Sequence, residues 1–587
     1  MTVTTASTLD DVTVAVSGQG GDGSLTVITL LGRILSARGF HLYSARNVAS
    51  RIKGGHAAAM VRGSHAYRGG LDGSVDLLVA FDQEAVERIG PSMAAGGIVV
   101  FDGSGGALPA GSLPDGMRVF EVPFARMAVR DLRRDLYKNS LAFGVLTRVL
   151  SVPDAEAEAR MVEGLGRLPA ALQEVNRIAL HHGFAYADDQ GIPDGGGVWA
   201  LEATVAPERL LITGNEALAL GFLVAGGRFF TGYPITPASE ILESLQRHLP
   251  RFGGVTVQAE DELSAVNMAI GAALTGVRAM TATSGPGLAL MQEGIGHAGS
   301  AEVPLVIVDC QRAGPSTGMP TKPEQSDLAM LVHGGNGEFP RVVLAPGGAA
   351  DCFELAVAGV GIARRLQCPV YIALDQAIAQ HAETVAPFDL DVPVEGGAMI
   401  GGHELAARAE YRRYLVTADG VSPWVVPGTP GGMNLVTGNE HNEWGQVSID
   451  PENRRTMMAK RARKLTAAAG DLPRAVRWGS DDAEVGVIGF GFTVAPMREA
   501  VERLADLGVP VAGLQPRTLW PVPAEVVDFV RAHRVTFVVE HNDEGQLLAL
   551  LVAAGAPLDR VRGIRRCDGL AFTPGELVER IVGEVGR

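Results

Sequence analysis

Short apolar runs alternate with helical patterns and polar loops along most of the chain. In the first third, apolar runs at Val12–Val16, Val75–Asp82 and Ile98–Asp102 are separated by segments with helical periodicity. Such runs are typical of strands in a parallel sheet that helices cover on both faces. The middle of the chain repeats the pattern at Phe229–Tyr233, Val255–Ala259, Ala279–Thr283, Leu305–Asp309, Val342–Ala345 and Val370–Leu374. This alternation predicts an α/β fold built from doubly wound sheets.

Two interruptions of the pattern divide the chain. After the middle segment the strand–helix alternation stops, and it resumes near the C-terminus at Val485–Phe490, Val511–Leu514 and Thr536–Glu540. We therefore predict three doubly wound α/β units joined by other segments. The predicted boundaries are a first unit at 1–190, a linker rich in Asp, Gly and Pro at 191–205, a second unit at 206–390, a connecting segment at 391–475 and a third unit at 476–587.

Composition and charge narrow the class of protein. Of the 587 residues, 47% are hydrophobic and 20% are charged, which supplies several cores and argues against a disordered chain. The formal net charge of −16 argues against nucleic acid or an anionic membrane as the partner, since both require a basic surface. No apolar run is long enough to span a bilayer and no secretory signal is visible, so we expect a cytoplasmic protein.

The 4 cysteines lie far apart and form no CxxC pair. We therefore do not expect a zinc site or an iron–sulphur cluster held by this chain alone. The group Glu440, His441 and Glu443 has the residue types of a metal site, but its spacing matches no strong metal-binding signature. A structural network is the preferred interpretation of that group, and no metal ligand is predicted.

A glycine loop near the N-terminus has the dinucleotide-binding pattern GxGxxG, with Gly18, Gly20 and Gly23 between a strand and a helix. A dinucleotide site also needs an acidic residue about 20 positions further on, and the segment Phe40–Asn47 contains none. Two interpretations stay open, a tight turn without a ligand or an anion site of another kind. An NAD-dependent dehydrogenase is thus the alternative from another class. The second glycine pair, in Arg51–His56, is a candidate loop facing a partner.

The most informative stretch is Gln258–Gly271, where acidic residues open a helix at the end of a strand. Helical spacing aligns Glu262 with the apolar residues Val266, Ala269, Ile270 and Ala273. Glu260 instead lies on a more polar face. A carboxylate on an apolar face needs a partner or a proton, which makes Glu262 a candidate functional group. The alternative is a capping acid satisfied by backbone amides.

Three loops rich in hydroxyl groups, glycine and proline follow predicted parallel strands, at Thr231–Ser239, Thr281–Gly287 and Gln311–Lys322. Ligands of open α/β sheets bind at the carboxyl ends of such strands. Hydroxyl groups, Arg312 and Glu262 converging there predict a site for a small anionic substrate beside a cofactor. The alternative for Arg312 is a salt-bridge partner on the surface.

These motifs in combination resemble the alpha subunit of the 2-oxoacid:ferredoxin oxidoreductases. The motifs are YPITPAS, the acidic helix start leading to MAIGAA, TSGPG and QRAGPSTGMPTKPEQSDL. The resemblance is greatest to the 2-oxoglutarate branch, in a variant with a gamma domain fused at the N-terminus. It implies a gamma-type domain at 1–190, a thiamine-diphosphate pyrimidine-binding domain at 206–390 and a transketolase C-terminal-like domain at 476–587.

The resemblance also assigns roles to residues of the site. Thiamine enzymes carry a glutamate nine positions before a helix glycine, and counting back from Gly271 gives Glu262. Glu262 would bond the aminopyrimidine ring and act as the catalytic group, with Ile235 and Thr236 also contacting the cofactor. Thr236 and Arg312 match positions that contact the 2-oxoacid carboxylate.

The distal end of the substrate is assigned to the same loop as Arg312. Thr321 matches a position that recognises this end, and Lys322 beside it can pair with a second carboxylate. A second carboxylate favours a dicarboxylic substrate such as 2-oxoglutarate. Pyruvate, branched-chain and aryl 2-oxoacids are the alternatives within the same chemistry, and a non-catalytic scaffold is the alternative outside it.

The reaction implied is oxidative decarboxylation of a 2-oxoacid with coenzyme A, with electrons passed to ferredoxin, or its reverse, reductive carboxylation. The chain has no GDG motif for diphosphate and Mg²⁺ and no cysteines for a cluster. The resemblance places Mg²⁺ and a [4Fe-4S] cluster in a separate beta subunit, which shares the thiamine diphosphate. We expect an (alpha-beta)₂ heterotetramer and no activity from this chain alone.

Overall fold

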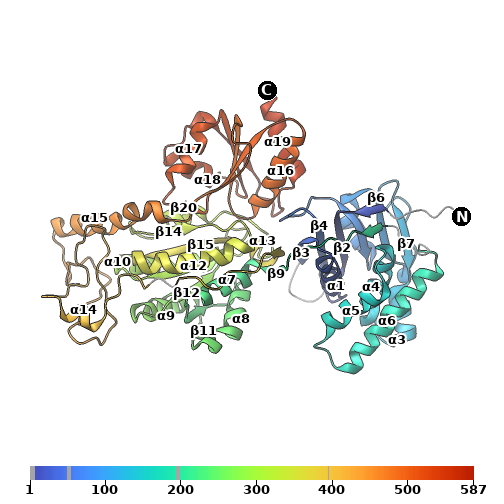
Figure 1. The fold of residues 1–587 in the computed structure, drawn as a ribbon, viewed down its shortest axis with the longest axis horizontal. Helices are drawn as coiled ribbons and strands as arrows, with labels where there is room; N and C mark the ends of the chain where they lie inside the picture. Colours follow the sequence, from blue (N-terminus) through green and yellow to red (C-terminus); the bar gives the residue numbers. More distant parts are fainter. Residues whose placement is uncertain (1–6, 49–54, 193–198, 394–395, 587) are drawn as a thin grey trace. The chain divides into compact units, whose positions relative to one another are not determined.

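The structure is a computed structural model of the chain, and it describes residues 7–48, 55–192, 199–393 and 396–586. Most of the second glycine-pair loop, residues 51–54, lies outside the described residues. The chain forms two compact units, which contain Met1–Leu211 with His381–Pro387 (unit 1) and Ile212–Gln380 with Phe388–Arg587 (unit 2). Both are built from sheets and helices, which confirms the predicted α/β class (Figure 1).

Unit 1 is organised around an eight-stranded sheet with the order β7-β6-β5-β2-β4-β3-β16-β9. Its strands are β2 (Asp11–Gln19), β3 (His41–Val48), β4 (His56–Ser64), β5 (Val75–Ala80), β6 (Met93–Asp102), β7 (Arg118–Val122), β9 (Leu210–Thr213) and β16 (Ala382–Val385). Strands β2, β5 and β6 are parallel, as the apolar runs predicted, and β7, which was not predicted, continues the parallel order. Strand β4 lies between β2 and β3 and pairs antiparallel with both. The sheet is therefore mixed.

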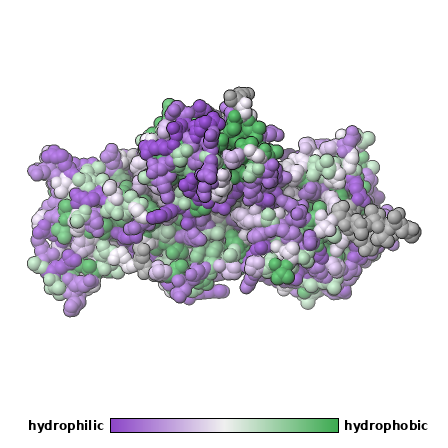
Figure 2. All heavy atoms as spheres, turned by 45° about the horizontal axis from the view of Figure 1, so that its top comes forward, coloured by the Kyte–Doolittle hydropathy of each residue, from purple (hydrophilic) through white to green (hydrophobic). Residues whose placement is uncertain are grey.

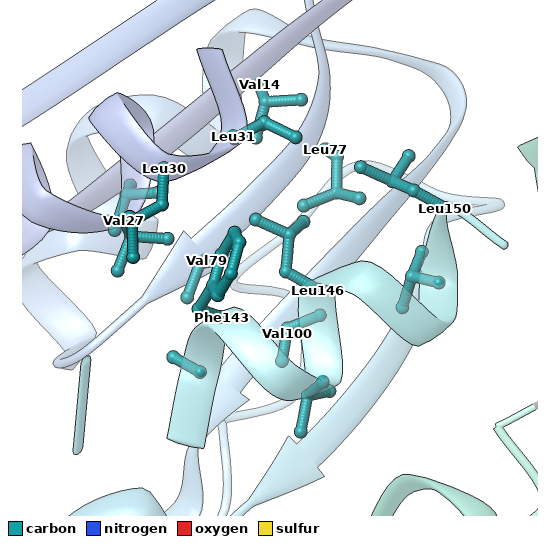
Figure 3. Close-up of a cluster of buried hydrophobic side chains, with 14 of the residues drawn as sticks. Val14, Val27, Leu30, Leu31, Leu77, Val79, Val100, Phe143, Leu146 and Leu150 are labelled. Atoms are coloured by element: carbon teal, nitrogen blue, oxygen red, sulfur yellow. The ribbon is translucent and has the colours of Figure 1, made fainter. Parts of the chain in front are cut away.

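The core of unit 1 lies where helices pack on the parallel half of this sheet. The helices are α1 (Ser24–Ala37), α2 (Gln83–Ile89), α3 (Phe124–Leu132), α4 (Lys138–Val149), α5 (Asp154–Leu165) and α6 (Ala170–Asp189). Figure 3 shows side chains of α1 and α4 meeting those of β2, β5 and β6, namely Val27, Leu30, Leu31, Phe143, Leu146, Val14, Leu77, Val79 and Val100. A small parallel pair, β1 (Ser7–Leu9) with β8 (Trp199–Leu201), completes the unit.

Unit 2 contains a seven-stranded sheet with the order β11-β10-β12-β13-β15-β14-β20. Its strands are β10 (Phe229–Gly232), β11 (Val255–Gln258), β12 (Ala279–Thr283), β13 (Leu305–Gln311), β14 (Val342–Leu344), β15 (Pro369–Asp375) and β20 (Thr518–Trp520). All neighbours are parallel except β14 and β20. The helices are α7 (Gly214–Val224), α8 (Ser239–His248), α9 (Glu262–Leu274), α10 (Gly285–Ser300), α11 (Leu328–His333), α12 (Ala349–Leu366) and α13 (Gln376–Gln380).

The C-terminal part of unit 2 forms a second sheet with the order β17-β19-β18-β21-β22. Its strands are β17 (Val476–Gly479), β18 (Val485–Gly489), β19 (Val511–Gln515), β21 (Val535–Glu540) and β22 (Val561–Arg565). Helices cover both faces, with α16 (Val494–Asp506) and α19 (Pro574–Val585) on one and α17 (Ala524–Ala532) and α18 (Gln546–Ala553) on the other (Figure 1). Successive side chains of β18 and β21 point to opposite faces, both covered by helices, which is why these strands are mainly apolar.

The two sheets of unit 2 share one hydrophobic core. The same buried cluster includes Ala265 of α9, Leu288 of α10, Ile307 of β13, Val527 of α17 and Leu550 of α18. The C-terminal part also contributes β20 to the larger sheet, where it pairs antiparallel with β14. The two sheets therefore belong to one packed body.

The connecting segment contains α14 (Gly402–Ala406) and α15 (Pro451–Ala468), and α15 is anchored by buried charges. Lys460 and Lys464 of this helix each form an ion pair of 2.5 Å with the Glu302 carboxylate, and all three side chains are fully buried. The guanidinium of Arg413 donates to the Glu302 carbonyl at 2.7 Å. These contacts hold the connecting segment against the larger sheet's layer of helices.

One face of the molecule is mainly polar. Figure 2 shows hydrophilic residues over most of the visible face, with hydrophobic residues in small groups between them. Among the described residues, no helix is long and apolar enough to cross a membrane.

Candidate functional site

Three predicted loops come together at one edge of the larger sheet in unit 2. They follow β10, β12 and β13, which are consecutive neighbours and run parallel. The chain leaves β10 towards β11 on one side and then crosses to β12 on the other. The edge between β10 and β12 is therefore a topological switch point, where ligands of open α/β sheets bind.

Glu262 is the first residue of α9, and a short turn separates it from the edge strand β11. The preceding residue, Asp261, caps the helix by accepting from the Ser264 N–H at 2.6 Å. The capping role therefore belongs to Asp261. The Glu262 side chain turns inward and is 6% exposed. Among the described residues no group donates a hydrogen bond to its carboxylate, so its oxygens keep their capacity to accept.

Gly287 explains how Glu262 reaches the interior. It lies in the first turn of α10, and a Cβ at this position would lie 2.6 Å from both Cγ and Oε1 of Glu262 and would also collide with the Thr283 hydroxyl. Only glycine lets α10 approach the carboxylate this closely. The TSGPG motif thus provides the space that Glu262 occupies.

Thr236 and Ile235 lie in the loop between β10 and α8. The carbonyl of Ile235 accepts from the Ser239 N–H at 3.0 Å, and the carbonyl of Pro237 accepts from the Asn215 amide at 2.9 Å. Asn215 is fully buried in α7. The loop is therefore fixed at both ends, with Thr236 between the two anchors.

Arg312 is buried and lies against this loop. It follows β13, is 7% exposed, and its Nη1 donates to the Thr236 carbonyl at 2.5 Å. Burial lowers the pKa of Arg312, and the nearby Asp327 carboxylate opposes that shift. The structure thus brings Arg312 and Thr236 together, and the alternative of a salt bridge on the surface is wrong. A buried guanidinium of this kind can bind a carboxylate as a charge-assisted donor.

Thr321 and Lys322 lie further along the same loop and are half-buried. The N–H of Ala313 donates to the Lys322 carbonyl at 3.0 Å, and the N–H of Lys322 donates to the Met319 carbonyl at 3.0 Å. The backbone of Lys322 is thereby held beside the residue that follows Arg312. Burial lowers the pKa of Lys322.

A pair of buried acids beside this site was missed in the sequence. Asp309 ends the apolar run of β13, and Asp327 precedes α11, where its carboxylate lies against the first turn of α10. Among the described residues no N–H group donates to either oxygen of Asp309. Burial and the neighbouring carboxylate raise the pKa of Asp309 well above its usual value, and burial raises the pKa of Asp327 to about 6. The raised pKa values of both neighbours favour a single proton held between the two carboxyl groups. An acid at the end of an apolar strand was the available signal.

Two other candidate groups, the N-terminal glycine loop and the acidic group around Glu440, are not part of this site. In the N-terminal glycine loop, the Asp22 carboxylate accepts from the Gln19 N–H at 2.9 Å and pairs with Lys138, so an anion already occupies the turn. Glu440 pairs with Arg461 at 2.7 Å and with Arg454, and Glu443 pairs with Arg412 at 2.8 Å. No group of three His, Cys, Asp or Glu suited to a metal ion occurs in the part of the chain that the structure describes.

The residues at the switch point fit the aminopyrimidine of thiamine diphosphate. A ring nitrogen of that group needs a carboxylate partner in a dry site, and Glu262 is buried with its acceptor capacity unused. Gly287 keeps the approach to that carboxylate free of a side chain. Among the described residues, no group of three His, Cys, Asp or Glu side chains beside this carboxylate could hold a metal ion.

Comparisons with known proteins match two families. Residues 221–460 match "Pyruvate flavodoxin/ferredoxin oxidoreductase, thiamine diP-bdg", and residues 13–186 match "Pyruvate ferredoxin/flavodoxin oxidoreductase". The first match contains the whole candidate site.

Individual proteins are similar over most of the chain. The 2-oxoglutarate oxidoreductase subunit KorA of Mycobacterium tuberculosis is 36% identical over 75% of this chain and 67% of its own. A 2-oxoacid:ferredoxin oxidoreductase subunit alpha of Sulfolobus sp is 29% identical over 97% of this chain and 96% of its own. A solved 2-oxoglutarate:ferredoxin oxidoreductase from Magnetococcus marinus, with 2-oxoglutarate, coenzyme A and succinyl-CoA bound, has a TM-score of 0.92 and 32% identity. That match covers 98% of this chain and 100% of the other.

Proposed function

The chain belongs to the 2-oxoacid:ferredoxin oxidoreductase family as an alpha subunit, and from this premise we propose that it acts on 2-oxoglutarate. The reaction proposed converts 2-oxoglutarate and coenzyme A to succinyl-CoA and carbon dioxide, and passes two electrons to ferredoxin. The same site would run the reverse reductive carboxylation when reduced ferredoxin is in excess. The similarity to a solved enzyme with these ligands bound supports the choice of substrate.

The observation that carries the proposal is the placement of Arg312. Its guanidinium is buried, lies against the carbonyl of Thr236 and shares the sheet edge with Glu262. A desolvated guanidinium at that place attracts the carboxylate next to the reacting carbonyl of a 2-oxoacid. Lys322, held on the same loop, supplies a cation for the second carboxylate of 2-oxoglutarate, and Thr321 supplies a hydroxyl beside it.

We propose that Glu262, Ile235 and Thr236 hold the cofactor. When bound, thiamine diphosphate supplies the carbon nucleophile that attacks the 2-oxo group. Glu262 would bond a ring nitrogen of the aminopyrimidine and hold a proton there, in a site that burial keeps dry. The loop of Ile235 and Thr236, fixed by Asn215 and Ser239, would keep the ring aligned with that carboxylate.

The remaining parts belong, in this proposal, to a beta subunit. That subunit would bind the diphosphate through Mg²⁺ and carry the [4Fe-4S] cluster that takes electrons singly, in an (alpha-beta)₂ assembly. Within this chain we assign residues 1–190 to a gamma-type domain, 206–390 to the pyrimidine-binding domain and 476–587 to a transketolase C-terminal-like domain. The gamma-type domain would cover the approach of coenzyme A or the contact between alpha-beta pairs.

The test uses the enzyme assembled with its beta subunit, thiamine diphosphate and coenzyme A. Viologen reduction is followed with 2-oxoglutarate, pyruvate, 3-methyl-2-oxobutanoate and phenylpyruvate as substrates. We expect the highest kcat/KM for 2-oxoglutarate and no reduction by this chain alone. A higher kcat/KM for any monocarboxylic substrate would reject 2-oxoglutarate as the substrate. The Lys322→Met variant should lose the preference for the dicarboxylic substrate while still turning over the others.

A further inference from the structure

The C-terminal part of unit 2 holds the loop that carries Arg312 and Lys322. We call residues 312–327 the substrate loop and residues 476–586 the C-terminal module. Gln325 of the substrate loop is fully buried. Its N–H donates to the His541 carbonyl at 2.7 Å, its side-chain oxygen accepts from the His541 N–H at 3.1 Å, and its side-chain amide donates to the Phe490 carbonyl at 2.8 Å. The Asn542 amide donates to the Gln325 carbonyl at 3.1 Å. Four hydrogen bonds thus fix one residue of the loop to the module.

A second attachment lies at the C-terminal end of the substrate loop. The side-chain amide of Gln546, in the first turn of α18, donates to the Ser326 carbonyl at 2.8 Å. Its side-chain oxygen accepts from the Ala329 N–H at 2.9 Å, at the start of α11. One side chain of the module therefore satisfies both a carbonyl of the loop and an N–H of the helix that follows.

Gly569 makes the third attachment, at the residues proposed to meet the far end of the substrate. A Cβ at Gly569 would lie 2.9 Å from Cβ of Lys322 and 3.1 Å from Cε of Met319. The Cβ of Lys322 cannot move without its backbone, so any side chain at position 569 displaces the loop. Glycine at this position lets the module and the loop touch.

The position of the substrate loop depends on these contacts, because the loop has little secondary structure of its own. It runs for many residues without helix or strand, from the end of β13 to the start of α11. Its internal contacts join Ala313 to Lys322 and to Met319 and hold the loop to itself. At its start the loop is bonded to the Thr236 carbonyl through Arg312. Its remaining part is held mainly by the C-terminal module, through the hydrogen bonds of Gln325 and Ser326 and the close approach of Gly569 to Lys322.

We infer that the C-terminal module positions the substrate loop, and that Gly569 is a positioning residue for the choice between dicarboxylic and monocarboxylic 2-oxoacids. The inference rests on the proposed function, because it takes Lys322 to face the far end of the substrate. The module then affects the choice of substrate, although none of its side chains is proposed to touch the reacting atoms. Displacing Lys322 changes the far-end contact, whereas Glu262 lies on α9 and Arg312 is anchored separately by its bond to the Thr236 carbonyl.

The test compares two glycines of the same module. Gly569 has φ +73° and Gly508 has φ +78°, so alanine strains the backbone similarly at both positions, but nothing lies within 4 Å of a Cβ at Gly508. In the assembled enzyme, we expect Gly569→Ala to lower the ratio of kcat/KM for 2-oxoglutarate to that for 2-oxobutanoate about tenfold. Gly508→Ala should leave this ratio within about twofold of the parent. An equal change in both variants, or an unchanged ratio in Gly569→Ala, would overturn the inference.

Two further variants keep the result decisive. If Gly569→Ala does not assemble, Gln546→Ala replaces it, since that change removes two hydrogen bonds from an accessible helix and should lower the ratio about threefold. An unchanged ratio in Gln546→Ala would then overturn the inference.

The Lys322→Met variant distinguishes failure of the inference from failure of the proposed function. If Lys322→Met leaves the ratio unchanged, the proposed role of Lys322 fails. If Lys322→Met lowers the ratio and Gly569→Ala does not, only the positioning role fails.

Discussion

Two of the buried carboxylates of unit 2, those of Glu302 and Glu262, have different surroundings. Each oxygen of Glu302 pairs with a lysine, Lys460 or Lys464, and the residue's carbonyl is bonded by Arg413. Glu262 has no donor among the described residues, and Arg312 nearby is bonded to the backbone carbonyl of Thr236. The first cluster is complete within the chain, whereas the second has bonding capacity left for a ligand.

The difference teaches that burial of a charge does not by itself identify a functional site. The lysines hold the pKa of Glu302 far below its usual value, and burial lowers the pKa of Lys460 to about 7. These shifts are large, yet every partner of Glu302 and Lys460 that causes them lies in the chain. A buried ion pair that is complete acts on folding. A buried charge with unused capacity at a switch point is the better indication of function.

The strongest test of this comparison removes the unpartnered carboxylate. Glu262→Gln keeps the shape of the side chain but cannot hold the proton at the cofactor ring, so kcat should fall by about 10²–10⁴-fold. The melting midpoint of the assembled enzyme should not change, because no bond within the chain is lost. Viologen reduction and thermal unfolding measure the two effects. The matched control is Glu260→Gln, which alters an exposed acid two residues away. A rate for Glu262→Gln within twofold of the parent would show that the assigned role is wrong.

The complete cluster should give the opposite result. Glu302→Gln leaves two buried lysines without a counter-charge, and we expect it to destabilise the fold by about 3–5 kcal/mol. The melting midpoint should fall by about 5–10 °C, while kcat of the enzyme that remains assembled stays unchanged. Replacing all three residues, as Glu302→Leu with Lys460→Met and Lys464→Met, should recover much of the midpoint because no buried charge then lacks a partner. A loss of kcat in Glu302→Gln with an unchanged midpoint would contradict the comparison.

A smaller effect is expected when lysine replaces Arg312, because the positive charge remains but the planar guanidinium is lost. Arg312→Lys removes the planar fork of donors, so KM for the 2-oxoacid should rise about tenfold with a smaller change in kcat. Steady-state kinetics at saturating coenzyme A measure this change. Arg228→Lys is the control, because Arg228 precedes the opposite end of β10 and also bonds backbone carbonyls. Equal KM values for Arg312→Lys and the parent would exclude Arg312 as the carboxylate site.

The smallest effect concerns the proton shared by Asp309 and Asp327. Their pKa values are raised in the folded state, so the pair favours folding most below the usual pKa of an aspartate. That contribution is lost as pH rises through the folded value, which is about 6 for Asp327. The melting midpoint should therefore fall by a few degrees between about pH 4 and about pH 6 because of this pair. In Asp309→Asn an amide replaces the shared proton, and this part of the pH dependence should be absent. An unchanged slope in Asp309→Asn would show that the pair shares no proton.

The sequence predicted the parts of the fold that follow from local pattern. The strands of the larger sheet are apolar on both faces, and their runs located β10, β12, β13 and β15 closely. Helical spacing selected Glu262 because its neighbours in α9 are apolar. The antiparallel pairing of β3 with β4 was not predicted, since a strand's sequence does not state the direction of its neighbour.

The parts of the site that depend on contacts between residues far apart in the chain could not be predicted from the sequence. Gln325 looks like any polar loop residue until His541 and Phe490 are placed beside it. Gly569 lies in a turn far from every motif, and its importance comes from the space next to Lys322. Asp309 carried a visible signal, an acid ending an apolar strand, but its partner Asp327 is close to it only in the folded chain.

Strand β20 has a consequence for recombining these proteins. It comes from the C-terminal module but completes the edge of the larger sheet beside β14, and the cluster of buried side chains continues from one sheet into the other. A chimera joined at residue 475 would combine the larger sheet of one parent with the edge strand of the other. The shared core would then contain side chains from two parents that are not matched in size and shape. The piece that can be transplanted between relatives is the whole of unit 2. Substitutions in the substrate loop and in the C-terminal module that contacts it therefore have to be compatible with each other, whether they arise in evolution or by design.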